Sequence, residues 1–73
     1  MDGNGIYIWP NGDKYVGQFQ NGKMKGQGTV TFSNGATHIG QFKNDKPHGY
    51  GTYIFPDGKE IAGQWKNGQY IEQ

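Results

Sequence analysis

Tyr15-Val16-Gly17-Gln18-Phe19-Gln20-Asn21-Gly22-Lys23-Met24-Lys25-Gly26-Gln27-Gly28 is the stretch that decides the fold, because its glycine and aromatic spacing recurs along the chain. The same spacing returns as His38-x-Gly40-x-Phe42 with Gly49-x-Gly51, and again as Ile61-x-Gly63-x-Trp65. When residues 3–25, 26–48 and 49–71 are aligned, six of the 23 positions are identical in all three copies. A fixed period of this length indicates an array in which each repeat is one supersecondary unit.

The composition describes a small folded domain. Glycine supplies 14 of the 73 residues, yet 15% of the chain is aromatic, which disordered glycine-rich linkers are not. The absence of cysteine excludes disulfides and thiolate metal sites. No apolar run approaches the length of a membrane span, and the first residues carry no signal-peptide pattern. We therefore expect a single domain over residues 1–73 in the cytoplasm, with the membrane surface as the alternative location.

Two sets of turns divide each repeat into strands. The first set is Pro10-Asn11-Gly12-Asp13, Ser33-Asn34-Gly35-Ala36 and Pro56-Asp57-Gly58-Lys59. Asn-Gly and Asp-Gly between strands predict either a two-residue hairpin turn or a short loop with glycine in the left-handed conformation. The second set, around Asn21-Gly22, Asn44-Asp45 and Asn67-Gly68, is expected to be looser and to connect one hairpin to the next, with Pro47 inside such a connection. The predicted units are thus three hairpins, 3–25, 26–48 and 49–71.

Strand alternation sorts the side chains onto two faces. One face is polar, with a few aliphatic residues, as in an antiparallel sheet covered on one side only. The other face is aromatic and is the predicted partner-binding surface; it carries Tyr7, Trp9, Tyr15, Phe19, Phe32, His38, Phe42, Tyr53, Phe55 and Trp65.

Six glycines have predicted structural roles. Gly12, Gly35 and Gly58 occupy the first set of turns. Gly17, Gly40 and Gly63 lie between large rings on the aromatic face, where they leave room for a ring from the neighbouring strand or mark a bulge.

The motif Tyr15-x-Gly17-x-Phe19-x-x-Gly22, followed by Lys25-Gly26-x-Gly28, resembles the MORN repeat (membrane occupation and recognition nexus). The second copy matches with His38 and the third, truncated copy with Ile61, where the family usually has tyrosine. The resemblance covers nearly the whole chain. It implies an all-β fold: an elongated, single-layer antiparallel meander of three successive hairpins.

Several kinds of chemistry are disfavoured. The Gly-x-Gly pairs lie between strands, whereas a phosphate-binding loop needs a helix after it. His38 and His48 lack the further ligands that zinc requires. The carboxylates fall largely in turns, where short polar side chains form local hydrogen bonds, and a single sheet offers no closed pocket for a catalytic pair. We therefore expect no enzyme activity, no cofactor and no small-molecule substrate.

The lysines carry the alternative function. Lys23, Lys25, Lys43, Lys46 and Lys66 gather toward one end of each repeat and are candidate contacts for anionic lipid headgroups. Ordinary edge and loop lysines that block strand pairing are the favoured explanation, because acidic residues dilute this strip of positive charge. The net charge is only +1 and no arginine is present, so nucleic acid is not expected. We expect a protein-interaction or scaffolding module that associates with itself or docks a protein partner on the aromatic face; the alternative is binding to anionic phospholipids such as phosphoinositides.

Overall fold

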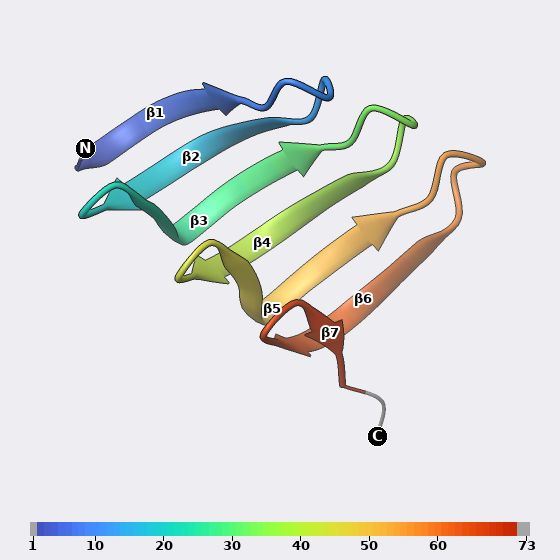
Figure 1. The fold of residues 1–73 in the computed structure, drawn as a ribbon. Coiled ribbons are helices and arrows are strands. Elements are labelled where there is room, and N and C mark those ends of the chain that lie inside the picture. Colours follow the sequence, from blue (N-terminus) through green and yellow to red (C-terminus); the bar gives the residue numbers. More distant parts are fainter. Residues whose placement is uncertain (1, 72–73) are drawn as a thin grey trace.

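A computed structural model describes residues 2–71 as one antiparallel sheet of seven strands in sequence order (Figure 1). The strands are β1 (Gly3–Ile8), β2 (Lys14–Gln20), β3 (Lys23–Thr31), β4 (Thr37–Lys43), β5 (Lys46–Ile54), β6 (Glu60–Lys66) and β7 (Gln69–Tyr70). Each strand pairs only with its neighbours in the chain, and no helix occurs in this part of the protein. The all-β, single-layer meander expected from the repeat is confirmed.

The first set of turns forms three-residue loops. In the first of them, the Gly12 N–H donates to the Trp9 carbonyl (3.0 Å) and the Trp9 N–H donates to the Asp13 carbonyl (2.9 Å). Gly12 has a φ of 100°, so the loop is a type I turn followed by a left-handed glycine. The loops at Gly35 and Gly58 repeat both the hydrogen bonds and the positive φ. Of the two turn types that the sequence allows, the structure has the short loop.

The second set of turns is tighter than predicted. Lys43 pairs with Lys46 across a loop of only two residues, Asn44 and Asp45, whose φ angles are 51° and 70°. Positive φ at both central positions defines a type I′ turn, whose twist matches that of the flanking strands. The expectation of loose connections was therefore wrong. These turns are hairpins in their own right, and Pro47 lies within strand β5.

The sheet bends sharply at pairs of glycines. Gly17 on β2 faces Gly28 on β3, and a Cβ atom on Gly17 would lie 2.5 Å from the Gly28 Cα atom. Gly40 and Gly51 repeat this close approach one repeat later. The strand register shifts directly beyond each pair. A bulge therefore follows Gly17 and Gly40, where backbones meet closely, while Gly63 leaves room for the Tyr70 ring of the neighbouring strand.

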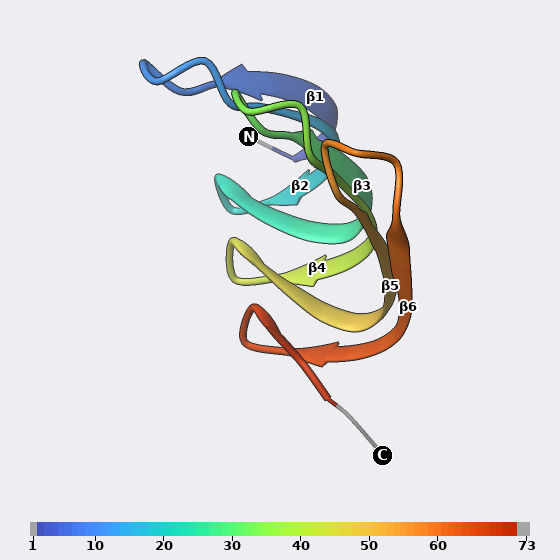
Figure 2. The same cartoon turned by 90° about the vertical axis from the view of Figure 1, so that its right-hand side faces the viewer.

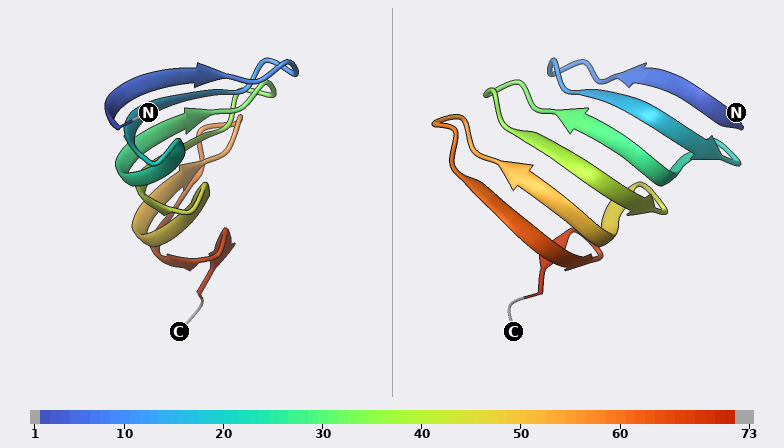
Figure 3. Two further views of the ribbon diagram at one scale, coloured as in Figure 1. Left: turned by 60° about the vertical axis from the view of Figure 1, so that its left-hand side comes forward. Right: turned by 180° about the vertical axis from the view of Figure 1, so that it is seen from behind.

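The bends curl the sheet into a trough whose two rims are the two sets of turns (Figures 2 and 3). The described chain measures 33 × 26 × 15 Å. The aromatic face lies on the concave side, so that side chains from one sheet pack against one another across the curve. The core formed in this way consists of Tyr15, Phe19, Met24, Val30 and Phe42, with Trp9 and Phe32 packed against it. A single layer thus encloses its own core.

Candidate functional site

The predicted aromatic face divides into two groups of rings. An inner cluster lies near the glycine bends and is buried apart from the half-buried Trp65; it comprises Tyr15, Phe19, His38, Phe42 and Trp65. An outer row lies at or just before the three-residue loops and remains partly exposed; it comprises Tyr7, Trp9, Phe32, Tyr53 and Phe55. The residues of the inner cluster pack against one another and stabilise the curved sheet. The outer row is the part of the face that another molecule can reach.

The inner cluster is a chain of edge-to-face ring contacts. The Tyr15 ring meets Phe19 at 5.1 Å and Phe42 at 5.2 Å between centroids. Such T-shaped pairs stabilise beyond the area that they bury. The Tyr15 hydroxyl donates to the Gln18 carbonyl (2.8 Å), and burial raises the pKa of this hydroxyl. Tyr15 lies over Gly28, whose missing side chain leaves the space for the ring.

His38 occupies the place of Tyr15 in the second repeat. Its ring meets Phe42 at 5.5 Å and Trp65 at 4.8 Å, both nearly perpendicular, and it lies over Gly51. Only 2% of the residue is exposed, and its Nε2 atom has no hydrogen-bond partner. Burial lowers the pKa of His38, because the charged form would lose its hydration. This imidazole is therefore neutral at pH 7.

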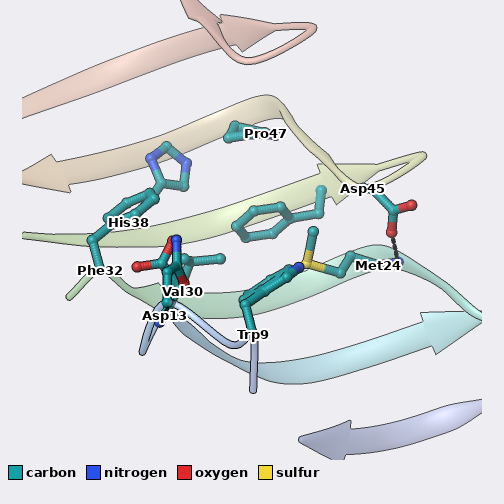
Figure 4. Close-up of a pocket in the computed structure, with 10 residues that line it drawn as sticks. Trp9, Asp13, Met24, Val30, Phe32, His38, Asp45 and Pro47 are labelled. Atoms are coloured by element: carbon teal, nitrogen blue, oxygen red, sulfur yellow. Dashed lines mark hydrogen bonds between the residues drawn. The ribbon is translucent and has the colours of Figure 1, made fainter. Parts of the chain in front are cut away.

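Two rings of the outer row, Trp9 and Phe32, line a hollow of about 220 Å³ on the concave face (Figure 4). Its apolar walls come from rings beside the three-residue loops, from residues of the inner cluster, and from side chains of strands β3 and β5. The lining residues are Trp9, Asn11, Asp13, Met24, Val30, Phe32, His38, Phe42, Asp45 and Pro47. Trp9 is held edge-on against Tyr7, with 4.9 Å between centroids. A fixed ring at the mouth of an apolar hollow is a feature of binding sites.

Two carboxylates lie at opposite ends of this hollow (Figure 4). Asp13 accepts hydrogen bonds from the Ser33 N–H (2.8 Å) and from the Asn11 side-chain amide (3.2 Å). Asp45 accepts one from the Met24 N–H (2.8 Å). Sequence reasoning treated both as turn residues and did not place them on the aromatic side. The available signal was that neither aspartate recurs in the other two copies of the repeat.

The five predicted lipid-contacting lysines lie on the convex face. Lys23 and Lys25 flank the buried Met24, and Lys43 and Lys66 follow the inward-facing Phe42 and Trp65. Strand alternation therefore points the lysines outward, and Lys23, Lys25, Lys43, Lys46 and Lys66 are all exposed. The two candidate binding surfaces of this chain face in opposite directions. They can accordingly be altered independently.

Other functional features are few in the described part of the chain. Within residues 2–71, no group of three His, Cys, Asp or Glu side chains is placed to hold a metal ion. In the same range, no helix has the length and apolar character needed to cross a membrane. What the concave face offers chemically is apolar and aromatic contact, with two carboxylates beside it.

Comparison with known families agrees with the repeat. The family model of the MORN repeat matches residues 1–14, 15–37, 38–60 and 62–70, which together span nearly the whole chain. These segments begin at Tyr15 and His38, the aromatic positions of the inner cluster, whereas the hairpin units defined above begin at Gly26 and Gly49. The period is the same in both descriptions. A search of curated proteins found no match to the chain.

Proposed function

The chain belongs to the MORN repeat family, a non-catalytic repeat module associated with protein or membrane-lipid interaction, and we propose that this member is a protein-docking module without enzyme activity of its own. The observation that carries the proposal is the outer row of partly exposed rings on the concave face, two of which, Trp9 and Phe32, line an apolar hollow. Aromatic residues are enriched where proteins bind one another, because they offer large contact areas at little entropic cost.

The rings of the outer row are ordered but partly exposed, which suits the docking of a partner. Tyr7 and Trp9 stand edge to face at 4.9 Å, and Tyr53 and Phe55 do so at 4.9 Å, so each pair holds its rings in place. Tyr7 keeps 49% of its surface exposed although it belongs to an apolar face. Rings that are already ordered lose little freedom on binding, which favours affinity. The partner is a second copy of the chain or another protein.

The test compares two double variants. Trp9→Ala with Phe55→Ala removes rings from both ends of the outer row, whereas Lys43→Gln with Lys46→Gln alters only the convex face. Proteins retained from a lysate by the unmodified chain are expected to be lost with the concave variant and kept with the convex one. Light scattering of the purified chain identifies self-association if a dimer reverts to monomer in the concave variant alone. Equal retention by all three chains, each shown to be folded by circular dichroism, would refute concave docking.

A second candidate, binding to anionic phospholipids, is favoured by one observation on the convex face. Lys43 and Lys46 are direct cross-strand partners, and like charges in that arrangement repel each other. An anionic headgroup between them would relieve the repulsion, and each lysine near a charged membrane contributes about 1 kcal/mol. Peripheral attachment to a membrane would follow from this candidate.

Liposome co-sedimentation decides this candidate. The unmodified chain should bind vesicles that contain phosphatidylserine or phosphoinositide, bind less as salt rises, and ignore neutral vesicles. The variant Lys43→Gln with Lys46→Gln should bind less, and the concave variant should bind as the unmodified chain does. Binding that is insensitive to salt or to both lysines would exclude the electrostatic mechanism.

A further inference from the structure

The hollow on the concave face combines apolar walls with fixed negative charge. Trp9, Phe32 and Phe42 supply rings from three separate segments of the sheet, while Asp13 and Asp45 supply carboxylates at its two ends (Figure 4). A hollow built only to pack against an apolar side chain gains nothing from two charges at its border. The two carboxylates therefore indicate the charge of the group that the hollow binds.

Backbone hydrogen bonds fix both carboxylates in position. Ser33 donates its N–H to Asp13 Oδ1, and Met24 donates its N–H to Asp45 Oδ1, at 2.8 Å in each case. Each carboxylate oxygen has two lone pairs, so both side chains keep acceptor capacity after these bonds are made. The carboxylates thus stand ready in place, without the entropic cost of ordering a free side chain on binding.

The residues that line the hollow include no lysine or arginine to neutralise these charges. His38 forms part of the wall with its Nε2 atom unpartnered, and its lowered pKa keeps it uncharged at neutral pH. The hollow consequently carries two negative charges and no positive one.

We propose that the hollow receives a basic side chain, arginine or lysine, from the docked protein, with its methylene stem against the rings and its charged group beside a carboxylate. The inference rests on the proposed protein-docking function and names the chemistry of the partner's anchor. A cation over a tryptophan or phenylalanine face is stabilised by the ring quadrupole. The stem of a basic side chain packs readily on apolar surface while its head stays at the polar border. Charge complementarity excludes phosphate groups from this face, in contrast to the convex lysines.

The probe for the test is Nα-acetyl-arginine methylamide, with the citrulline analogue as a neutral molecule of nearly the same shape. In amide-resolved NMR titrations of the whole chain, the arginine probe should shift the Trp9 indole and Met24 amide signals saturably. We expect a dissociation constant in the millimolar range, which is ordinary for one side chain. The citrulline analogue should bind much more weakly. Equal binding of the two probes, or no saturable shift at these signals, would overturn the proposal.

Substitutions assign the effect to the carboxylates. Asp45→Asn keeps an oxygen for the Met24 N–H and removes only the charge, so the fold should be retained. It should weaken arginine binding about fivefold, as expected for about 1 kcal/mol from a partly exposed ion pair. Asp57→Asn is the control, because the Asp57 carboxylate also accepts a backbone N–H, from Lys59 in its own turn, but does not line the hollow. An equal loss with Asp57→Asn would show a general charge effect and refute a defined site.

The two proposals fail separately. If the arginine probe does not bind, but Trp9→Ala with Phe55→Ala still abolishes retention of a partner, docking stands and the basic anchor is wrong. If the probe binds and no partner depends on the outer row, the hollow is a cation site but the docking function is wrong.

Discussion

Replacing Gly28 by alanine tests how the single sheet encloses a core. The added Cβ atom would run into the Tyr15 ring, which contacts the Gly28 backbone directly. The ring cannot retreat, because Phe19 and Phe42 hold it at 5.1 and 5.2 Å and none of its surface is exposed. The substitution therefore has to displace a buried ring or reopen the bend.

The expected loss follows from three contributions. Overpacking of a filled core costs about 1–3 kcal/mol. Displacement of Tyr15 weakens its hydrogen bond to the Gln18 carbonyl, worth about 1 kcal/mol. Alanine within a strand is more favourable than glycine, which offsets roughly 0.5–1 kcal/mol of this loss of stability. We expect Gly28→Ala to lower the free energy of unfolding by about 2 kcal/mol, and the melting temperature by about 10 °C for a domain of this size.

A double-mutant cycle isolates the ring contact. The second repeat carries His38 at the position of Tyr15, so Tyr15→His is a replacement that the fold already accommodates. A Cβ atom added to Gly51 would lie 2.8 Å from the His38 Nε2 atom. In the Tyr15→His background, Gly28→Ala should cost at least 1 kcal/mol less, measured by urea unfolding followed through tryptophan fluorescence and circular dichroism. If the two substitutions are additive, or if Gly28→Ala alone is neutral, the explanation of the bend by ring-over-glycine packing is refuted.

Three further predictions concern single positions. His38 has a lowered pKa in the folded state, so the unfolded state binds more protons and stability should fall as pH drops below about 6.5; His38→Tyr should abolish this fall in unfolding experiments between about pH 5 and 7.5. Asp13→Ala should destabilise by about 1 kcal/mol, and adding Ser33→Pro should recover part of the loss, because the donor that lacks an acceptor is removed with it. Lys43→Gln should stabilise by a few tenths of a kcal/mol at low salt, and less at high salt, by removing repulsion from Lys46.

The sequence predicts the repeat, the strands and the two faces, because all three follow from local spacing. The turn types were harder, since Asn-Gly occurs in both sets. In the first loop, Pro10 precedes Asn11-Gly12 and fixes the φ value that position i+1 of a type I turn requires. No proline precedes Asn21-Gly22, and the dipeptide itself forms the centre of a type I′ turn. Proline thus favours the three-residue loop in the first and third copies, but the loop at Ser33-Asn34-Gly35 has the same geometry without one.

The depth of the concave face could not be predicted from a strand pattern. Alternation places Tyr15 and Tyr7 on the same face, yet Tyr15 is fully buried and Tyr7 is half-exposed. Tyr7 lies on the edge strand β1, whereas Tyr15 on β2 has a strand on each side and lies over Gly28 at the bend. Curvature depends on contacts between strands, and a single-strand pattern does not contain it.

Differences between the copies of the repeat locate the candidate site. Between the first two copies, Asp13 accepts from Ser33 and Asp45 accepts from Met24. At the equivalent positions between the second and third copies, Ala36 and Pro56 replace Asp13 and Ser33, and Gly68 and Pro47 replace Asp45 and Met24. Where the acceptor is missing, a proline has also removed the donor, so neither arrangement leaves a backbone N–H unpaired.

Acceptor and donor are lost together between the second and third copies, so the fold tolerates the absence of the carboxylates at that junction. The second junction satisfies its backbone with proline alone, so Asp13 and Asp45 are not required by the repeat as such. Yet these two residues are the charges that border the hollow. The substitutions that set the first junction apart from the second are therefore the ones that give the concave face its negative character, and a consensus of the three copies would conceal them.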